Sequence, residues 1–467
     1  MGDYSFRELE QLIYSFVCDL ARRITVAFLN EEDERIKKNR DKKKYLIHDN
    51  LSGTVKTVYG DVEYKRRYYK DQETGEKIFL LDDALKMKTV GLYSENVVKM
   101  VLDVCKEMSF GSAAQFITEH TGRAISKTEC WNIVQEVGSN IEEYQKQLAA
   151  GYEKKDPAEK KESKILFVES DGVWINHQLP NKKKGKKMEL KLCTTYEGWD
   201  AEDEHRLVGK QVFGGNCSAK AFKKKTDAVI NAAYNIDETE QIILNGDGAG
   251  WVRNLLDEDA IYQLDRFHVM KYIRHYISDK NIQGQIVEAL AEKNPSRMLE
   301  VIKMYINSVD GQDTKAVENA RRLYSYLDCG DAVLNYRERG IKIPDPPEGI
   351  VYRAGGVQEN QNCTLVCGRM KHKRRRWSES GSNNMVNVLC AFSNEDIDQY
   401  IRQPEMVLIE DQTMKEFLSA GRIPKKNGSG SRYLDLFSAA IPELQSSNTA
   451  LTQTLRGLLC SMMASGN

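Results

Sequence analysis

The spacing of apolar residues in the first 90 positions predicts a long helix followed by a small β-rich segment. Over residues 4–40, apolar side chains recur every three or four positions, which is the helical period. The following stretch, TVKTVYGDVEYKRRYYKD, alternates apolar and polar residues on either side of a turn at Gly60-Asp61. A further short strand is expected at Lys77–Leu81.

Three consecutive helices are expected next, at Ser94–Met108, Gly111–His120 and Ser126–Gln145. Gly122 lies in the second connection, and Ser126 is a predicted N-cap of the third helix. This pattern is typical of a helix-turn-helix that binds DNA. Three-helix units without a DNA-binding role are also common, so that alternative stays open.

The pattern changes after a polar stretch that contains Pro157. The predicted elements are, in order, strands at Lys164–Trp174, Met188–Thr195 and Arg206–Phe213, a helix at Ala219–Tyr234, a strand at Gln241–Asn245, a short helix at Gly250–Leu256, a strand at Ala260–Leu264 and a helix at Arg266–Ile277. This order predicts a ribonuclease-H-like domain, in which helices accompany a mixed five-stranded sheet.

The expected fold is therefore α/β and multidomain. The expected parts are an N-terminal helix with a small β-rich segment (1–93), a helix-turn-helix region (94–150), a linker (151–163), a ribonuclease-H-like catalytic domain in two pieces (164–278 and 350–395), an all-α insertion between them (279–349) and a C-terminal region without an assigned role (396–467).

Composition and charge narrow the class of protein. Hydrophobic residues make up 41% and charged residues 29%, as in globular proteins. No apolar stretch is long enough to cross a bilayer, no secretory signal is visible, and the ten cysteines lack paired spacing. We therefore expect a cytoplasmic protein with reduced thiols and no membrane partner.

A net charge of −1 argues against a simple polyanion binder, but the positive charge is concentrated in runs. These runs lie at Lys37–Lys44, Lys182–Lys187, Lys223–Lys225 and Arg369–Arg376. Solvated loops are the alternative interpretation of the lysine runs, whereas the arginines of the last run favour phosphate.

Three carboxylates are the candidates for metal-dependent phosphodiester chemistry. Asp171 interrupts an apolar strand, and Asp247 directly follows another in a glycine-rich NGDGAGW segment. Glu359 lies at the expected start of a later helix. Two divalent ions roughly 3.5–4 Å apart need such acids from separate segments. Individually, the three also fit a hairpin turn, a loop aspartate and a helix-dipole partner.

The chain resembles the ISLre-type family of bacterial insertion-sequence transposases and, more distantly, the Mutator-like transposases. The resemblance covers most of residues 1–395 and lies in ESDG around Asp171, NGDGAGW around Asp247, LDRFHV at Leu264–Val269, and GGVQEN at Gly355–Asn360 with the downstream RMKHKRRRWSESG. It implies an Asp-Asp-Glu transposase with Asp171, Asp247 and Glu359 as catalytic acids and metal ligands. It also implies two Mg²⁺ ions, which Mn²⁺ replaces in some such enzymes.

Further residues are candidates for supporting roles. Asp265 and His268, one helical turn apart, resemble an accessory element of the Mutator-like enzymes; a helix-capping Asp beside a satisfied His is the alternative. The basic run is expected to bind DNA phosphates and an unpaired base, and its candidates are Arg369, Lys371, Lys373, Arg374, Arg375, Arg376 and Trp377. A nuclear-import signal is the rival interpretation of this run.

We therefore expect a bacterial, nucleoid-associated transposase that cleaves and joins double-stranded DNA at the terminal inverted repeats of an insertion sequence. Its partners would be those repeats and target DNA, and a homodimer or higher oligomer is expected because two ends must be synapsed. Two rivals stay open: a structure-specific nuclease of the same fold without strand transfer, and a non-catalytic helix-turn-helix regulator.

Overall fold

The computed structural model describes residues 5–87, 91–151, 160–178, 187–257, 259–310 and 313–401. At the N-terminal side, the 34-residue helix α1 (Phe6–Asn39) begins at a capping box formed by Ser5 and Glu8. The next elements are β1 (Tyr45–Thr57), β2 (Gly60–Asp71), β3 (Lys77–Ile78) and α2 (Leu80–Ala84). The three strands form an antiparallel sheet in sequence order, as the alternating pattern predicted.

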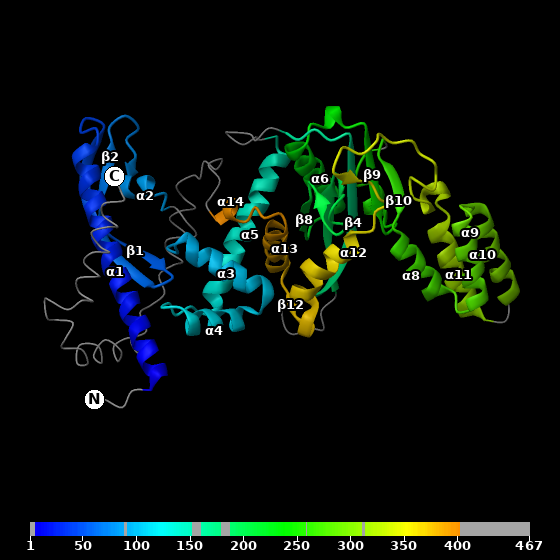
Figure 1. Ribbon diagram of the computed structural model, residues 1–467, viewed down its shortest axis with the longest axis horizontal. Coiled ribbons are helices and arrows are strands. Elements are labelled where there is room, and N and C mark those ends of the chain that lie inside the picture. The colour runs from blue at the N-terminus through cyan, green and yellow to red at the C-terminus, as the bar shows by residue number, and fades with distance from the viewer. Residues whose placement is uncertain are drawn as a thin grey trace.

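The three predicted helices are present as α3 (Glu95–Glu107), α4 (Phe110–His120) and α5 (Lys127–Ala149). Ser126 is the N-cap of α5 and forms a capping box with Glu129, so this prediction is confirmed. The helices are not a separate body, because their apolar side chains share one core with the main sheet and with α13 (Glu379–Ser393). In Figure 1 they lie between α1 and that sheet.

The main sheet is mixed, and the chain is accordingly a mixed α/β protein. Its strands are β4 (Ile165–His177), β5 (Lys187–Tyr196), β8 (Gln211–Gly215), β9 (Gln241–Gly246) and β10 (Ile261–Leu264), in the spatial order β10-β9-β4-β5-β8. β5 runs antiparallel to both of its neighbours, and β9 and β10 run parallel to β4. The short β12 (Arg376–Trp377) pairs with the far end of β4.

The predicted strand Arg206–Phe213 is wrong as a single element. Its first part, β7 (Leu207–Val208), joins a small sheet with β6 (Gly198–Asp200) and β11 (Ile350–Val351), whereas β8 joins the main sheet. Gly209 separates the two parts with φ +64°. A side chain there would collide with Glu197 and Tyr234, so the chain turns at a residue that only glycine fits easily.

Helices complete both sides of the main sheet. They are α6 (Ala219–Ala233), the 3₁₀ turn η2 (Ile236–Glu238), α7 (Gly250–Arg253) and α8 (Arg266–Tyr276). The expected helical insertion follows as α9 (Lys280–Ala291), α10 (Pro295–Val309), α11 (Thr314–Leu327) and the 3₁₀ turn η3 (Gly330–Val333), and its apolar side chains share one cluster with β10 and α8. Figure 1 shows α9 to α11 at the opposite end of the molecule from α1.

The chain then returns to the sheet. The helix expected near Gly355 begins at Gln358 as α12 (Gln358–Gln361) and continues as the π-helix η4 (Asn362–Lys371), followed by η5 (His372–Arg374). After α13, the last described element is α14 (Asp398–Ile401).

Some expectations fall on residues that the structure does not describe. Most of the predicted linker, the basic run except Lys187 in the β4–β5 connection, and the C-terminal region beyond Ile401 lie outside the described residues. Among the described helices, none has the length and apolar character that crossing a membrane requires.

The crossing of α5 and α13 depends on one glycine. A side chain at Gly138 would place its Cβ 2.6 Å from the Cα of Asn384, so Gly138→Ala must push the helices apart. We expect this substitution to lower the free energy of unfolding by about 1–3 kcal/mol. Gly284→Ala in α9 is the matched control, because nothing lies near that position; it should stabilise by up to about 1 kcal/mol. Urea denaturation of both variants tests the difference, and equal effects would contradict this account of the crossing.

Candidate functional site

Three aspartates occupy one row across three neighbouring strands. Gly246 of β9 is in register with Ser170 of β4 and with Leu264 of β10. The next residues along these strands are Asp171, Asp247 and Asp265. The row lies at the carboxyl ends of the parallel strands β9 and β10, which is where open α/β sheets bind ligands. β4 itself continues to His177, so the alternative of a hairpin turn at Asp171-Gly172 is wrong.

Asp171 is held rigidly at the centre of this row. The residue is only 7% exposed; Oδ1 accepts a hydrogen bond from the Gly172 N–H at 2.7 Å and Oδ2 accepts one from Asn362 Nδ2 at 2.7 Å. Burial is the main cause that raises the pKa of Asp171 from 3.8 to about 6, and the charges of Asp247 and Glu359 raise it further. A bound cation would relieve this repulsion.

Glu359 and His268 converge on Asp171. One potential ligand atom from each of the three residues lies within 4.8 Å of the other two. His268 Nε2 is 3.8 Å from Asp171 Oδ2, and His268 Nδ1 is 3.6 Å from Asp265 Oδ2. Burial, the strongest influence, lowers the pKa of His268, but the surrounding carboxylates together raise it above its usual value.

The accessory pair therefore lies inside the candidate site. Asp265 caps α8 by accepting a hydrogen bond from the Phe267 N–H at 2.8 Å, as the capping alternative proposed. Its other oxygen faces His268, whose second ring nitrogen faces Asp171. The Asp265 cap is confirmed, but His268 Nδ1 is buried without a hydrogen-bond partner among the residues that the structure describes, so the satisfied His of that alternative is not seen; the accessory role stays a prediction.

Asp247 stands at the edge of the same cluster. It follows β9, is half-buried, and accepts a hydrogen bond from the Ala249 N–H at 2.9 Å. It is not one of the three residues whose ligand atoms lie within 4.8 Å of one another, but its charge raises the pKa of Asp171 and of Tyr326 in α11. The Tyr326 ring packs against Gly248, where φ is +92°, so the helical insertion contacts the Asp247 loop.

Glu169 has a role that the sequence did not predict. Although it lies two residues before Asp171 on β4 and is buried, its carboxylate accepts hydrogen bonds from the backbone N–H groups of Gly356, Val357 and Gln358 at 2.9–3.2 Å. Tyr196 and Asn245 donate to it as well. Glu169 thereby anchors the start of α12, the helix that carries Glu359.

Neighbouring polar residues extend this anchor across the sheet. Asn245 lies opposite both Glu169 and Gln263 in the strand register, and Gln263 donates to Asn245 at 3.2 Å and to the Ala354 carbonyl at 2.5 Å. Gly355 has φ +100°, and a side chain there would press on Glu169. Only glycine therefore suits this close approach of the loop to the sheet.

Asn362 and the π-helix were also missed. Asn362 orients Asp171 and is itself held by Gln358 Nε2 at 3.0 Å. A π-helix is a rare conformation that occurs frequently at functional sites. The signals that could have identified this region were the paired glycines at 355–356 and the polar QENQN run.

The expectation that Arg369 and Trp377 bind DNA is wrong, because both are buried. Arg369 is 3% exposed, donates to the Cys105 carbonyl at 2.6 Å and lies over the rings of Phe110 and Trp377. Burial lowers the pKa of Arg369 to about 10. Trp377 donates its indole N–H to the Met370 carbonyl. These two side chains join η4 to the three-helix unit.

The remaining basic residues form an exposed loop next to this anchor. Lys371, Lys373, Arg374 and Arg376 are exposed, whereas Arg375 is half-buried and donates to the Arg369 carbonyl. Lys373 and Arg374 both have φ +55°, a strained conformation for residues with side chains. This segment therefore exposes four basic residues close together in the sequence.

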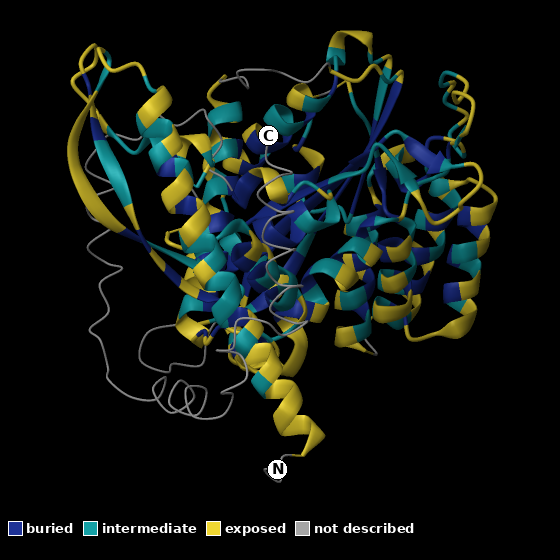
Figure 2. Cartoon of the chain, turned by 60° about the vertical axis from the view of Figure 1, so that its left-hand side comes forward, coloured by how far each residue is buried: buried dark blue, intermediate teal, exposed yellow. Residues whose placement is uncertain are grey.

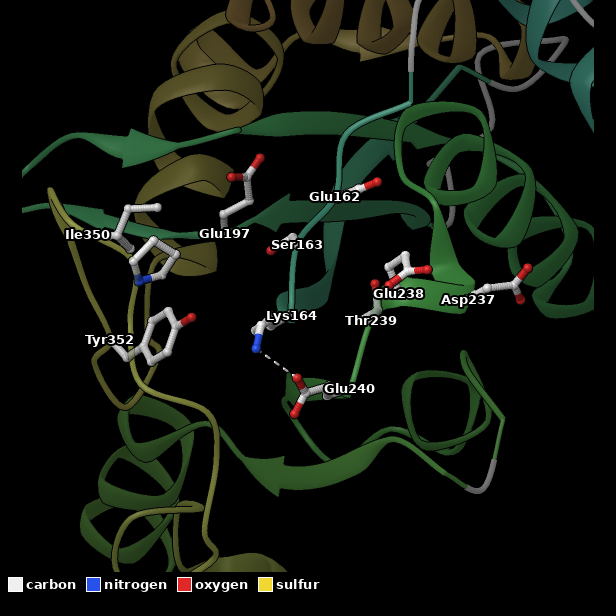
Figure 3. Close-up of a pocket in the computed structure, with 11 residues that line it drawn as sticks. Glu162, Ser163, Lys164, Glu197, Asp237, Glu238, Thr239, Glu240, Ile350 and Tyr352 are labelled. Atoms are coloured by element: carbon white, nitrogen blue, oxygen red, sulfur yellow. Dashed lines mark ion pairs between the residues drawn. The ribbon is translucent and has the colours of Figure 1, made fainter.

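A separate hollow of about 500 Å³ lies at the other end of the main sheet (Figure 3). It is lined by Lys164 and Glu240, which form an ion pair at 3.2 Å just before β4 and β9, and by further acids that include Glu197 and Asp237. None of the candidate catalytic residues lines it. Asp171, Asp247 and Asp265 lie instead at the opposite end, in the row described above.

Removing the Glu169 carboxylate should release the loop that it anchors. Glu169→Met keeps the approximate shape but removes the acceptor for three backbone N–H groups, so we expect a loss of about 3 kcal/mol or more in the free energy of unfolding. Glu169→Gln should lose less, because it keeps one acceptor oxygen. Amide hydrogen exchange at residues 356–358 should be faster in Glu169→Gln than in wild type, and faster still in Glu169→Met. Exposed Glu379→Gln is the control, and unchanged exchange in Glu169→Met would refute the anchoring role.

The raised pKa of Asp171 gives a signed stability prediction for the metal-free chain. The pKa of Asp171 is about 6 in the folded chain and 3.8 without these interactions. Protonated Asp171 therefore adds to the free energy of unfolding below about pH 4, and this addition is lost as pH rises through about 6. Asp171→Asn should therefore stabilise the chain by about 1–2 kcal/mol at pH 8, and the gain should shrink at pH 5. Denaturant unfolding at the two pH values measures this. An Asn variant that is less stable at pH 8 would contradict the electrostatic cost.

The similar curated proteins carry a family name that states no activity. A chain named "UPF0236 protein in vanSb 3'region", from Streptococcus gallolyticus, is 27% identical over 75% of this chain and 75% of its own length. "UPF0236 protein TTE0610/TTE0881/TTE1053/TTE2432", from Caldanaerobacter subterraneus subsp. tengcongensis, is 27% identical over 83% of this chain and 78% of its own length. A crystal structure of a pre-cleavage Mos1 transpososome covers 51% of this chain and 79% of its own at 10% identity, but its TM-score of 0.14 is too low to support an argument.

The family assignment made from the motifs needs a correction. The matching family model is described as an uncharacterised protein family, UPF0236, and it spans residues 2–406. The relatives above carry the same family name. The assignment to the ISLre-type transposases is therefore wrong, and the chain belongs to UPF0236.

Proposed function

We propose that the chain is a metal-dependent transposase that cleaves DNA at terminal inverted repeats and joins the ends to target DNA. The observation that carries the proposal is the convergence of Asp171, Glu359 and His268 within 4.8 Å, beside Asp247, from four separate segments. Phosphodiester chemistry with divalent ions requires such oxygen ligands on rigid supports.

The arrangement of the main sheet supports the same proposal. Three antiparallel strands in chain order, β4, β5 and β8, are followed by β9 and β10, which return by helical connections to lie parallel on the other side of β4. This is the order of a ribonuclease-H-like sheet, and we propose that this part of the chain has that fold. Asp171 then lies on the central strand β4, Asp247 directly follows the neighbouring strand β9, and Glu359 lies on the later helix α12.

The residues present suit divalent cations. Asp171 and Glu359 offer carboxylate oxygens, and Asp247 stands next to them, so these three would hold two Mg²⁺ or Mn²⁺ ions. When bound, the ions would activate a water or 3′-hydroxyl and neutralise charge at the phosphorus.

The chain's own groups would prepare the reaction. Asn362 and the Gly172 N–H keep the Asp171 carboxylate in one orientation, and Glu169 fixes the start of the helix that carries Glu359. His268, oriented by Asp265, would carry a proton on Nε2 and donate it to a phosphate oxygen. The exposed loop with Lys371, Lys373, Arg374 and Arg376 would bind flanking phosphates.

The names of relatives add a further argument. One relative's name joins four locus labels under one protein in a single organism. Several copies of one gene in a genome are what a mobile element would leave. We propose the same behaviour for this chain, with DNA recognition by the unit at residues 94–150 and with nucleoid association.

The test is a cleavage and joining assay with labelled duplexes from the repeats that flank the gene, in Mg²⁺ or Mn²⁺. Wild type should nick at the repeat boundary and form strand-transfer products with a supplied target. Asp247→Ala and Glu359→Ala should each reduce cleavage at least about 100-fold while DNA binding, measured by gel shift, stays within a few-fold. Exposed Glu379→Ala is the matched control.

Each other outcome has a definite meaning. Cleavage without joined products would replace the transposase with a nuclease of the same chemistry. Binding without cleavage in either metal would leave a DNA-binding regulator. Undiminished cleavage by Asp247→Ala would remove that residue from the site.

A further inference from the structure

Helix α1 carries a regular apolar face over residues 6–28. On this side of the helix, apolar residues follow one another at intervals of three, four and four, repeated twice, at Phe6, Leu9, Ile13, Val17, Leu20, Ile24 and Phe28. An 11-residue repeat corresponds to about 3.67 residues per turn, so the residues stay on one side of a nearly straight helix. Such regularity over two repeats is typical of a helix that pairs with another helix.

Most of this face is exposed and points away from the part of the chain that the structure describes. The buried residues of α1, Cys18, Leu29 and Asp33, lie on the opposite side, where Cys18 contacts Gly122 and Asp33 binds Arg67 of β2. On the outer side, Phe6 is 79%, Ile13 55%, Val17 52% and Phe28 53% exposed. Leu9 is also exposed, and Leu20 and Ile24 are half-buried.

The first three turns of α1 extend beyond the body of the molecule (Figure 2). Residues 5–17 contain no buried side chain. An isolated helix of about that length is marginal in water, and most helical stability comes from packing an apolar face. The projecting part of α1 therefore needs a partner for its apolar side.

We propose that the outer face of α1 packs against the same face of α1 in a second copy of this chain. Five exposed side chains on this face, Phe6, Leu9, Ile13, Val17 and Phe28, offer roughly 100 Å² each. Pairing two copies would therefore bury about 1,000 Å² in total, which reaches the lower limit of a specific protein interface. This proposal does not depend on the proposed function.

The charges around the face favour a protein partner. Arg7, Arg22 and Arg23 are balanced by Glu8, Glu10 and Asp19 on the first half of the helix, and Asp19 already binds both Arg22 and Arg23. Helices that lie on anionic membranes are rich in Lys and Arg on their polar side, and nucleic-acid surfaces are basic. A helix with balanced charges and an apolar face therefore suits a second copy of itself better than an anionic membrane or a nucleic acid.

The experiment measures the mass of the full-length protein by light scattering after size-exclusion chromatography at tens of micromolar. We expect wild type to elute as a dimer, twice its 53.3 kDa chain mass. Ile13→Asp/Val17→Asp should shift it to monomer and raise the dimer dissociation constant at least about 100-fold, because two charges would be buried in each copy. Met304→Asp, at a 68% exposed position on α10, is the control and should stay dimeric.

Circular dichroism checks the fold of each variant, and because positions 13 and 17 are exposed no unfolding is expected. A second measurement uses Ile13→Cys/Val17→Cys in a Cys363→Ser background, where an α1–α1 interface gives a covalent dimer on oxidation. A monomeric wild type, a dimer that survives the double Asp substitution, or wild type that binds lipid vesicles as a monomer would each overturn the proposal.

Discussion

The geometry of the candidate site rests on one buried carboxylate. Glu169 lies in the central strand of the sheet, where an unpaired charge would cost several kcal/mol. Burial, the largest influence, raises the pKa of Glu169, and hydrogen bonds from Tyr196, Asn245 and the backbone of Gln358 counter it. Because the backbone donors belong to a distant loop, the carboxylate receives its full set of hydrogen bonds only when that loop lies on the sheet. The same contact brings Glu359 to Asp171.

Most elements could be predicted because the signals that define them are local. The alternation in β1 and β2, the Ser126 cap of α5 and the apolar run of β9 are each readable within a few residues. The placement of Asp171 and Asp247 in one row also follows from strand order, since both directly follow residues that pair in the sheet. The split of the expected third strand at Gly209 did not follow, because its cause is a side-chain collision with Glu197 and Tyr234.

The contacts that orient the acids were not readable from the sequence. Asn362 reaches Asp171 across a separation of 191 residues, and no local pattern marks an asparagine as a partner of a distant aspartate. The error over Arg369 and Trp377 has a similar origin. A basic run implies an exposed surface, but Arg369 is enclosed by Phe110 and Trp377 and donates its Nε–H to the Cys105 carbonyl. Burial in a shared core depends on the three-dimensional arrangement of α3, η4 and β12.

The long sequence separation between Glu169 and its backbone donors also determines when the candidate site forms during synthesis. Gly356 lies 187 residues after Glu169, and at the usual 5–20 residues per second the ribosome needs roughly 10–40 s to synthesise that interval. Strands β4, β5, β8, β9 and β10 are all synthesised before the interval ends, but the three backbone N–H groups that donate to Glu169 are not yet present. The hydrogen bonds between Glu169 and the loop can therefore form only after the helical insertion has been made, so the acids assemble late in synthesis and no earlier fragment holds all of them together.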